Sequence, residues 1–474
     1  MNRIIHFKKL TAVIFITVTV FFLRAPVDAG AINDAFIIGQ AQAYSSEFFE
    51  MMMLLLEDYA GMELTPEFIY EAALRGIADE LDLFTAYMDK NEYNAFIGNL
   101  SGHFEGIGVQ IDAGDDGYVY IHSVIPNTPA EEAGLLKGDI ILYINDNDIY
   151  GFTQQQAADM IRSGPQLTTL KILRNNEEMS FTMYKRQIIL NPVEVYAFDE
   201  IWPSAGENDN TSVRYMRVSS FDGESAAGFK EAIRQLTEAD VTGVVLDMRG
   251  NGGGYLDQVV AVARMVLPEG PIFYDVDASG VMNAHFSHLQ NPPFNRIVVL
   301  VDNFTASAAE LLTAALQDSG VAIVVGETTY GKGVIQTTVD LSTGGAFRYT
   351  YAEYLRRSGE KIDRIGVIPD VYIKYPGELP ATIETDENGY AEWIVRLKDI
   401  LRFLGFVIPD DSDVYDEPTK QCVAELKISL GLDNNDLIDE ETSAAINQRL
   451  YAVYTETDVV LEAGYKILLE MIGR

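Results

Sequence analysis

The strongest constraint on the fold lies between residues 190 and 375, where apolar strand patterns alternate with helical patterns. Residues 215–221 have the pattern of a strand and residues 226–236 that of a helix, and short buried-strand runs follow at 244–246 and 321–325. This alternation is typical of a layered α/β fold, in which helices cover a sheet. We therefore expect an α/β core here, within a multidomain α/β chain of 474 residues.

Within this region a serine and a lysine stand 25 positions apart, at 307 and 332. Ser307 lies in the run Phe-Thr-Ala-Ser-Ala-Ala-Glu (304–310), whose alanines allow a helix to begin in a tightly packed place. A serine hydroxyl needs a neighbouring base at neutral pH, and a lysine is a base only when burial keeps it neutral. The pair therefore indicates a serine nucleophile with Lys332 as its base. Gln336, four residues after Lys332, is the candidate for orienting the lysine.

A glycine-rich run, Leu-Asp-Met-Arg-Gly-Asn-Gly-Gly-Gly (246–254), follows a buried-strand pattern. Consecutive glycines allow backbone amides to approach a developing negative charge. Together with Thr-Ala-Ser-Ala-Ala-Glu and Tyr-Gly-Lys-Gly-x-x-Gln, this run resembles the carboxyl-terminal processing peptidases, secreted serine proteases that use a Ser/Lys dyad. The resemblance implies a ClpP/crotonase-like α/β protease core, an oxyanion hole made by the amides of Gly253 and Ala308, and no metal ion or cofactor. Asp247 and Arg249 flank the glycines and are interpreted as residues that make structural ion pairs, with a supporting role in the site as the open alternative.

Two other functions were open to the same residues. Residues 326–332 fit the first seven positions of a phosphate-binding P-loop, but position 333 is Gly rather than a magnesium-binding Ser or Thr, and residues 334–339 have a strand pattern where a P-loop begins a helix. The other alternative is a catalytically silent scaffold that tethers exported proteins through its binding domains. The presence of Ser307, Lys332 and Gln336 favours the protease over the scaffold.

Residues 101–189 have short strand patterns separated by turn signals, a pattern different from that of the core. Gly-Ile-Gly at 106–108, Pro-Ala-Glu-Glu-Ala-Gly-Leu at 129–135 and Gly-Asp-Ile at 138–140 resemble a PDZ domain with a β-sandwich-like fold. Such domains bind an extended peptide by strand addition and hold its terminal carboxylate with loop amides. The resemblance implies a carboxylate loop formed by Gly106, Ile107 and Gly108. It also implies that Arg162 links PDZ occupancy to the protease.

The N-terminal residues have the features of an export signal. Residues 1–30 contain a basic start, an uncharged stretch from 10 to 23 and small residues around Ala29, which predicts a signal peptide or an uncleaved membrane anchor. An extracytoplasmic protein, secreted or membrane-anchored, follows. Residues 31–100 are expected to be helical, with Thr65 as an N-cap and Pro66 at the first helical position.

The C-terminal residues predict a separate helical module. Residues 391–451 resemble the small three-helix peptidoglycan-binding-like domain, with two helix starts 23 residues apart, at Asp416 and Asp439. Two interpretations remain open: a domain that binds cell-wall peptidoglycan and a helical packing domain that binds none. The last helix, within residues 452–474, is expected to pair with the N-terminal helices of another subunit in a homodimer.

The formal net charge of −37 bears on partners and on catalysis. Nucleic acids and anionic membranes would repel such a chain, so we expect protein or peptide substrates with accessible C-termini and no nucleic-acid partner. A negative surround also raises the pKa of a lysine. Desolvation around Lys332 must therefore outweigh that field if the lysine is to act as a base.

Overall fold

The computed structural model describes residues 35–114, 116–189, 191–202, 212–294, 296–380, 392–410 and 412–473. The chain divides into two compact units, Met1–Glu80 and Leu81–Arg474. The predicted leader lies outside the described residues. Over the ranges that the structure describes, no helix is long and apolar enough to cross a membrane.

The first unit contains two helices, α1 (Ala35–Asp58) and α2 (Pro66–Asp79). The predicted start of α2 is confirmed, because Thr65 is its N-cap and its Oγ1 accepts a hydrogen bond of 3.1 Å from the Phe68 amide. Pro66 occupies the first helical position, where the missing N–H costs nothing. These contacts end the preceding loop and set the direction of α2.

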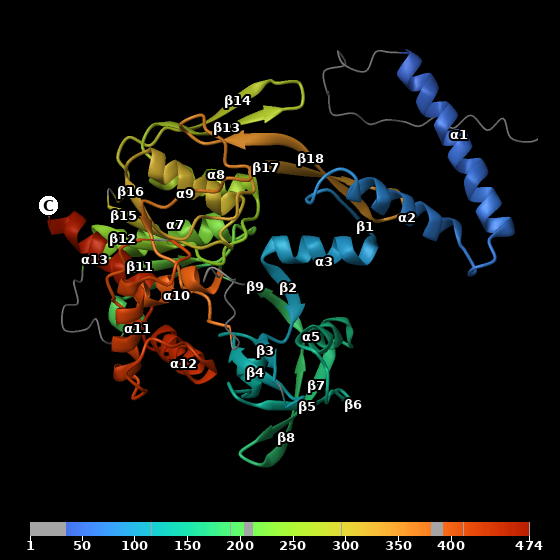
Figure 1. The fold of residues 1–474 in the computed structure, drawn as a ribbon. Helices are drawn as coiled ribbons and strands as arrows, with labels where there is room; N and C mark the ends of the chain where they lie inside the picture. The colour runs from blue at the N-terminus through green and yellow to red at the C-terminus, as the bar shows by residue number, and fades with distance from the viewer. Residues whose placement is uncertain are drawn as a thin grey trace, which may run out of the picture. The chain divides into compact units, whose positions relative to one another are not determined.

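The second unit contains the expected α/β core, which we call the central domain (residues 191–375; Figure 1). Its six-stranded sheet has the order β10-β11-β12-β15-β16-β19, and all neighbouring pairs are parallel except β10 with β11. The central strands β12 and β15 are buried along their whole length, which is why they appear as unbroken apolar runs. The strand bounds are β10 (Val193–Tyr196), β11 (Val213–Val218), β12 (Gly243–Asp247), β15 (Ile297–Val301), β16 (Ala322–Gly326) and β19 (Val371–Tyr372).

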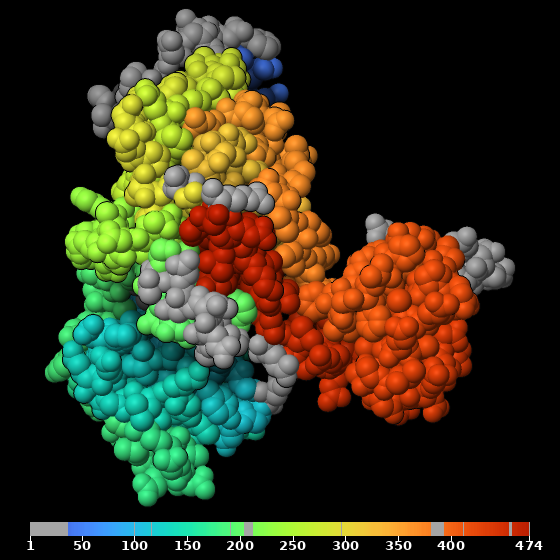
Figure 2. All heavy atoms as spheres, turned by 90° about the vertical axis from the view of Figure 1, so that its left-hand side faces the viewer, coloured from blue at the N-terminus to red at the C-terminus, as the bar shows by residue number. Residues whose placement is uncertain are grey.

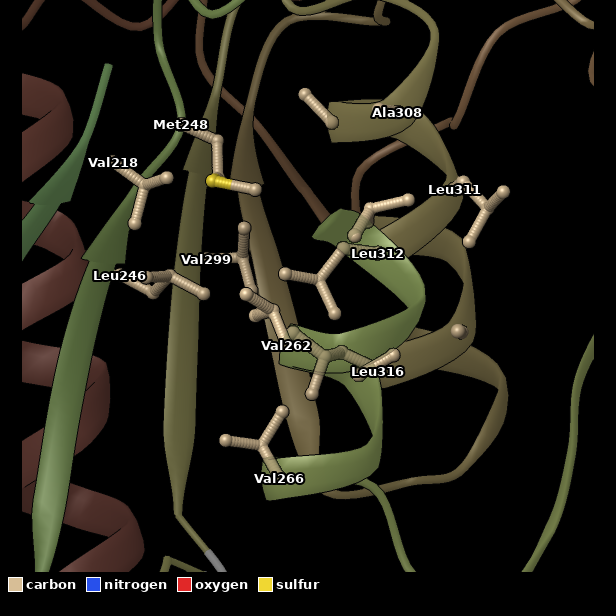
Figure 3. Packing of buried hydrophobic residues seen from close by; sticks show 14 of the residues in the cluster. Val218, Leu246, Met248, Val262, Val266, Val299, Ala308, Leu311, Leu312 and Leu316 are labelled. Carbon is tan, nitrogen blue, oxygen red and sulfur yellow. The ribbon is translucent and has the colours of Figure 1, made fainter. Parts of the chain in front are cut away.

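One face of this sheet packs against three helices, α7 (Ser225–Glu238), α8 (Leu256–Val266) and α9 (Ala308–Asp318). Figure 3 shows Leu246 of β12 and Val299 of β15 facing Val262 of α8 and Leu312 of α9. Successive side chains of a strand point to opposite faces, so Val245, between its buried neighbours on β12, belongs to the core on the other side. The sheet therefore needs a second cover.

That cover is α13 (Val459–Gly473), the last helix of the chain, shown in red against the central domain in Figure 2. Its residues Leu461, Tyr465 and Leu468 pack with Val245 and Leu300 of the sheet. The apolar face of α13 is thus occupied within the chain. We expected this helix to pair with another subunit, but it packs against the sheet of its own chain. The amphipathic pattern of a helix does not by itself show which apolar surface the helix covers.

A second sheet of five strands lies in the same unit, in the order β1-β18-β13-β14, with β17 also paired to β18. The segment that follows Lys332 is strand β17, as its pattern predicted, so the P-loop alternative is excluded by the lack of a helix there. The strand bounds are β1 (Ala86–Met88), β13 (Gly270–Asp277), β14 (Met282–Ser287), β17 (Val334–Asp340) and β18 (Ala346–Leu355). Two further helices belong to this unit: α3 (Lys90–Ser101), which precedes the strands of the central sheet, and α6 (Phe198–Ile201), which lies between β10 and β11 in sequence.

Residues 103–189 form a domain with a hydrophobic core of its own. Its main sheet has the order β3-β4-β5-β7-β8, with β6 paired to β5, so β3 is an edge strand; β2 and β9 form a separate pair. The elements are β2 (His103–Gly106), β3 (Val109–Ala113), β4 (Val119–Val124), α4 (Pro129–Ala133), β5 (Ile140–Ile144), β6 (Asn147–Asp148), α5 (Gln154–Ser163), β7 (Leu167–Arg174), β8 (Glu177–Tyr184) and β9 (Arg186–Ile189).

The predicted C-terminal helices form a module with its own core, which we call the helical module: α10 (Glu392–Phe403), α11 (Glu417–Ser429) and α12 (Glu440–Glu456). Both predicted helix starts are confirmed. Asp416 accepts a hydrogen bond from the Thr419 amide (3.0 Å) and Asp439 accepts one from the Thr442 amide (2.8 Å). The module therefore lies in sequence between the central domain and α13.

Candidate active site

Ser307 occupies a strained position at the start of α9. It is the N-cap residue, with φ 57° and ψ −119°, a region that residues other than glycine rarely adopt. Its amide donates a hydrogen bond of 2.8 Å to Glu310 Oε2, and the alanines on either side pack closely, with Ala308 and Ala309 buried. The small residues noted in the sequence thus permit a tight turn, and the bond to Glu310 maintains its strained backbone.

The fully buried carboxylate of Glu310 connects the serine segment to the lysine segment. Besides the Ser307 amide, it accepts hydrogen bonds from Thr329 Oγ1 (2.5 Å), the Gly331 amide (2.6 Å) and the Lys332 amide (2.8 Å). Burial raises the pKa of Glu310, while these four donors oppose that effect. A group surrounded only by donors is best satisfied as a carboxylate, so one buried charge fixes the backbones of both candidate catalytic residues.

The hydroxyl of Tyr354, on β18, makes a second connection between the same segments. It lies 3.0 Å from the Ser307 carbonyl oxygen and also hydrogen bonds to the Lys332 carbonyl oxygen. The side chain is fully buried, and burial raises the pKa of its hydroxyl well above the ordinary value. Tyr354 is therefore a neutral hydrogen-bond donor that holds both the Ser307 segment and the Lys332 segment.

Lys332 lies in the apolar surroundings that its predicted role requires. Its Nζ is 4.7 Å from the centre of the Phe84 ring. Desolvation lowers the pKa of Lys332 to about 8, and the charge of Arg348 acts in the same direction, whereas Glu310 and Asp82 oppose it. Desolvation thus outweighs the negative surround, which is the condition stated from the sequence. Among the described residues no hydrogen bond joins Lys332 Nζ to Ser307 Oγ, so the two groups are apart in this conformation.

Ser307 and Lys332 line one pocket of about 390 Å³. Gln336, on β17, lines it too; its amide nitrogen donates to Thr350 Oγ1 (3.3 Å), and among the described residues no hydrogen bond joins its amide oxygen to Lys332. The orienting role of Gln336 stays a prediction. Apolar side chains form much of the remaining wall: Phe96, Ile97, Leu100, Leu256 and Leu311.

The glycine loop (residues 250–254) lies directly against the serine. A Cβ added to Gly253 would be 2.8 Å from Ser307 Cβ, so only glycine fits at this place. In this conformation the Gly253 amide donates to Asn251 Oδ1 (2.9 Å). Ala308 is the first residue of α9, where amides have no partner within the helix. Both residues adjoin the nucleophile, and their role as an oxyanion hole stays a prediction.

A larger cavity, about 570 Å³, lies in the domain of residues 103–189. Gly106, Ile107, Gly108 and Arg162 all line it, together with the edge strand β3 and helix α5. Gly108 has φ 90°, and an added Cβ would lie 2.2 Å from Thr128 Oγ1, which explains the need for glycine. The predicted carboxylate loop and Arg162 thus line one groove. Within the described ranges Arg162 makes one ion pair, with Asp159 at 3.7 Å.

Some residues of the site had no predicted role. Glu310 is the last residue of the serine run, and Tyr354 lies 22 residues after Lys332, outside the serine, lysine and glycine runs. Phe84 is close to Lys332 only because β1 pairs with β18, with Ala86 opposite Arg348. Asn251 lies in the glycine run itself, between Gly250 and Gly252. Its complete burial, which marks it as part of the site, is seen only in the structure.

Comparison with known proteins shows the family of the chain. Residues 212–373 match Peptidase family S41, and residues 100–173 match the PDZ domain family. The carboxyl-terminal-processing protease of Synechocystis sp. (strain ATCC 27184 / PCC 6803 / Kazusa) is 33% identical over 343 residues, which cover 71% of this chain and 78% of that protein. This chain belongs to the carboxyl-terminal processing protease family. It is a serine peptidase with a PDZ domain and a mixed α/β architecture, as expected.

Further relatives of this carboxyl-terminal processing protease have similar extents. Carboxy-terminal processing protease CtpB of Bacillus subtilis (strain 168) is 29% identical over 416 residues, covering 85% of this chain and 84% of that protein. The solved structure of a photosystem II D1 C-terminal processing protease is 28% identical and covers 70% of this chain and 88% of its own, with a TM-score of 0.42. That score is too low to add to the sequence comparison.

Proposed function

We propose that this peptidase is an exported endopeptidase that binds C-terminal regions of protein substrates in its PDZ domain and cleaves them with a Ser307/Lys332 dyad. The observation that carries the proposal is the common pocket of the two residues, whose backbones are joined by one buried carboxylate. A second support is the pKa of Lys332, lowered to about 8, which leaves an appreciable neutral fraction near neutral pH.

The reaction follows from these groups. Neutral Lys332 Nζ takes the proton of Ser307 Oγ as the oxygen attacks the scissile carbonyl, and the amides of Gly253 and Ala308 stabilise the oxyanion. The lysine ammonium returns the proton to the departing amine. Water, deprotonated by Lys332, then attacks the acyl-enzyme, and the lysine ammonium returns the proton to Ser307 Oγ as the ester bond breaks, which restores the free serine and the neutral lysine. Before the first step, Lys332 Nζ must form a hydrogen bond with Ser307 Oγ, and the Gly253 amide, which donates to Asn251 Oδ1, must turn toward the substrate. Bonds of this kind often tighten only when substrate is bound.

Substrate capture uses the PDZ groove. β3 is an edge strand and can accept an added peptide strand once Gln154 Nε2 releases the Ile111 carbonyl oxygen, to which it donates at 2.6 Å. Residues 106–108 line the same groove, and their amides would bind the terminal carboxylate. The wall includes apolar side chains of Ile107, Ile111 and Ile161, which favour an apolar last residue. Arg162 at the rim supplies a positive charge close to such a carboxylate.

The decisive experiment is cleavage of an unstructured protein by the chain from Gly30 onward, compared with Ser307→Ala and Lys332→Ala and followed by mass spectrometry. We expect fragments from the wild type alone. Inactivity of the wild type, persisting after PDZ-binding peptides are added, would favour the silent scaffold. Activity that survives Ser307→Ala would show that another residue is the nucleophile.

Three further proposals rest on the sequence alone. Export through residues 1–30 predicts accumulation outside the cytoplasm, which fractionation of cells with and without this segment tests. Peptidoglycan binding by the helical module predicts sedimentation with purified cell walls, lost when the module is removed. A homodimer predicts twice the chain mass in light scattering, and a monomer at all concentrations would refute it.

A further inference from the structure

Arg249, immediately before the glycine loop, lies between carboxylates from two distant parts of the chain. On one side it contacts the fully buried Asp247, with Nη2 2.6 Å from Oδ2. On the other, its Nη1 and Nη2 donate to Asp458 Oδ1 (2.9 Å) and Oδ2 (2.8 Å), a bidentate pair. We call Asp247, Arg249 and Asp458 the Arg249 cluster. Two of its members belong to the central domain, and the third comes from beyond the helical module.

Asp458 marks the return of the chain from the helical module. Its Oδ1 accepts a hydrogen bond of 3.0 Å from the Leu461 amide, so it also caps the start of α13. The hydroxyl of Tyr375, the last residue of the central domain before the module, donates to the same oxygen at 3.3 Å. The two connections of the module therefore meet at Asp458, which pairs with Arg249. The catalytic domain is discontinuous in sequence, and Asp458 completes it.

From Arg249 a short series of contacts leads to the nucleophile. The Gly250 amide donates to both oxygens of Asp302 (3.0 Å each), and the Asn251 carbonyl accepts a bond of 2.9 Å from the Ala306 amide, next to Ser307. Asn251 Oδ1 in turn accepts the Gly253 amide. The glycine loop thus begins at the residue that follows Arg249, and contacts with Asp302 and Ala306 hold its first two residues beside Ser307.

We propose that Asp458 is a positioning residue for the reaction: through Arg249 it holds the glycine loop in register with Ser307. The proposal rests on the proposed role of Ser307 and of the loop amides. Loss of the Asp458 charge leaves Arg249 paired with Asp247, so no buried charge becomes unpaired and the fold persists. What is lost is the second anchor of the guanidinium plane, and the loop shifts relative to the nucleophile.

The test is Asp458→Asn in the full chain, with Asp439→Asn as its matched control. Asparagine is as good an N-cap as aspartate, so both variants retain their helix caps, but only Asp458→Asn removes a carboxylate from the Arg249 cluster. We expect kcat to fall roughly ten- to a hundredfold in Asp458→Asn with KM unchanged, because small displacements of catalytic groups have effects of this size. Asp439→Asn should match the wild type.

A second measurement does not depend on proteolysis. Hydrogen–deuterium exchange of peptides that cover residues 248–256 and 303–308 should be faster in Asp458→Asn than in Asp439→Asn, while the thermal midpoints of the two variants stay equal. Unchanged exchange and kcat would overturn the proposal, as would equal losses in the two variants. If no variant, the wild type included, cleaves protein but exchange still rises only in Asp458→Asn, then the proposed function has failed and the structural coupling has not.

Discussion

At the scale of single residues, the proposed mechanism depends on how a lysine in a strongly acidic protein becomes a base. The pKa of Lys332 is lowered to about 8 chiefly by burial beside Phe84, and secondly by the charge of Arg348. The base form is neutral, so kcat/KM should rise as pH increases through about 8 and level off above it. This sign is opposite to that expected if a protonated lysine were required.

Arg348→Gln tests this cause directly. Removal of a positive charge that disfavours the ammonium raises the pKa of Lys332, so the rising limb of the pH profile should move to higher pH and activity near pH 7 should fall. The measurement is kcat/KM from about pH 6 to about pH 10. Arg234→Gln, at an exposed pair on α7, is the control and should leave the limb in place. A limb that moves to lower pH in Arg348→Gln would contradict the assignment.

The hydroxyl of Tyr354 offers a second test at this scale. Tyr354→Phe keeps the buried ring but removes the donor shared by the Ser307 and Lys332 carbonyls. We expect a loss of about 1 kcal/mol in the free energy of unfolding and a roughly tenfold lower kcat. Tyr349→Phe, on the same strand but exposed, should change neither quantity. Equal kcat in both variants would show that the two loops are held without this hydroxyl.

At the scale of elements, three consecutive glycines meet three different surroundings. An added Cβ meets nothing within 4 Å at Gly252, Ser307 Cβ at 2.8 Å at Gly253, and the Phe221 carbonyl oxygen at 2.2 Å at Gly254. Gly253 and Gly254 also have positive φ, whereas Gly252 does not. The three glycines therefore differ in how well they tolerate a larger residue, although the sequence is the same at each position.

Alanine at each of these positions should separate them by denaturant unfolding. Gly252→Ala should stay within about 1 kcal/mol of the wild type. Gly254→Ala should lose more than about 3 kcal/mol, because backbone and not a flexible side chain opposes its methyl group. Gly253→Ala should lose activity through its contact with Ser307. Equal stability of the Gly252 and Gly254 variants would contradict the described path of the loop.

At the scale of the whole molecule, the catalytic domain is interrupted by the helical module and completed by α13. The module has a separate core that includes Trp393, Leu397 and Ile446, whereas α13 shares the core of the central sheet. The module should thus be removable, and α13 should not.

Two deletions test this arrangement. Replacement of residues 377–456 by a short Gly/Ser linker should give a soluble protein that retains Ser307-dependent cleavage, since Tyr375 and Asp458 already lie within a hydrogen bond of each other.

Truncation after residue 376 exposes the apolar face beneath α13, where each buried side chain contributes about 1.5–3 kcal/mol, enough in sum to exceed a typical stability. We expect the truncated chain to be insoluble or unfolded by circular dichroism; a folded, active truncation would refute the role of α13.

Local patterns in the sequence were sufficient for much of this structure. The strand and helix patterns of residues 215–325, the N-caps Thr65, Asp416 and Asp439, and the strand after Lys332 each depend on residues close in sequence, so they could be predicted. The serine and lysine runs and the glycine run were recognisable for the same reason, and the family comparison agrees with them.

Contacts between distant residues were decided only by the tertiary structure. The sequence by itself determined the residue types of the proposed dyad, the requirement that Lys332 be desolvated, and the layered α/β core. It did not determine that Phe84 lies over Lys332, that Glu310 and Tyr354 join both catalytic segments, or that Asp458 returns to Arg249. The position of α13 was also decided only by the tertiary structure. An apolar helical face can pack against any apolar surface, and here it packs against the second face of the chain's own central sheet.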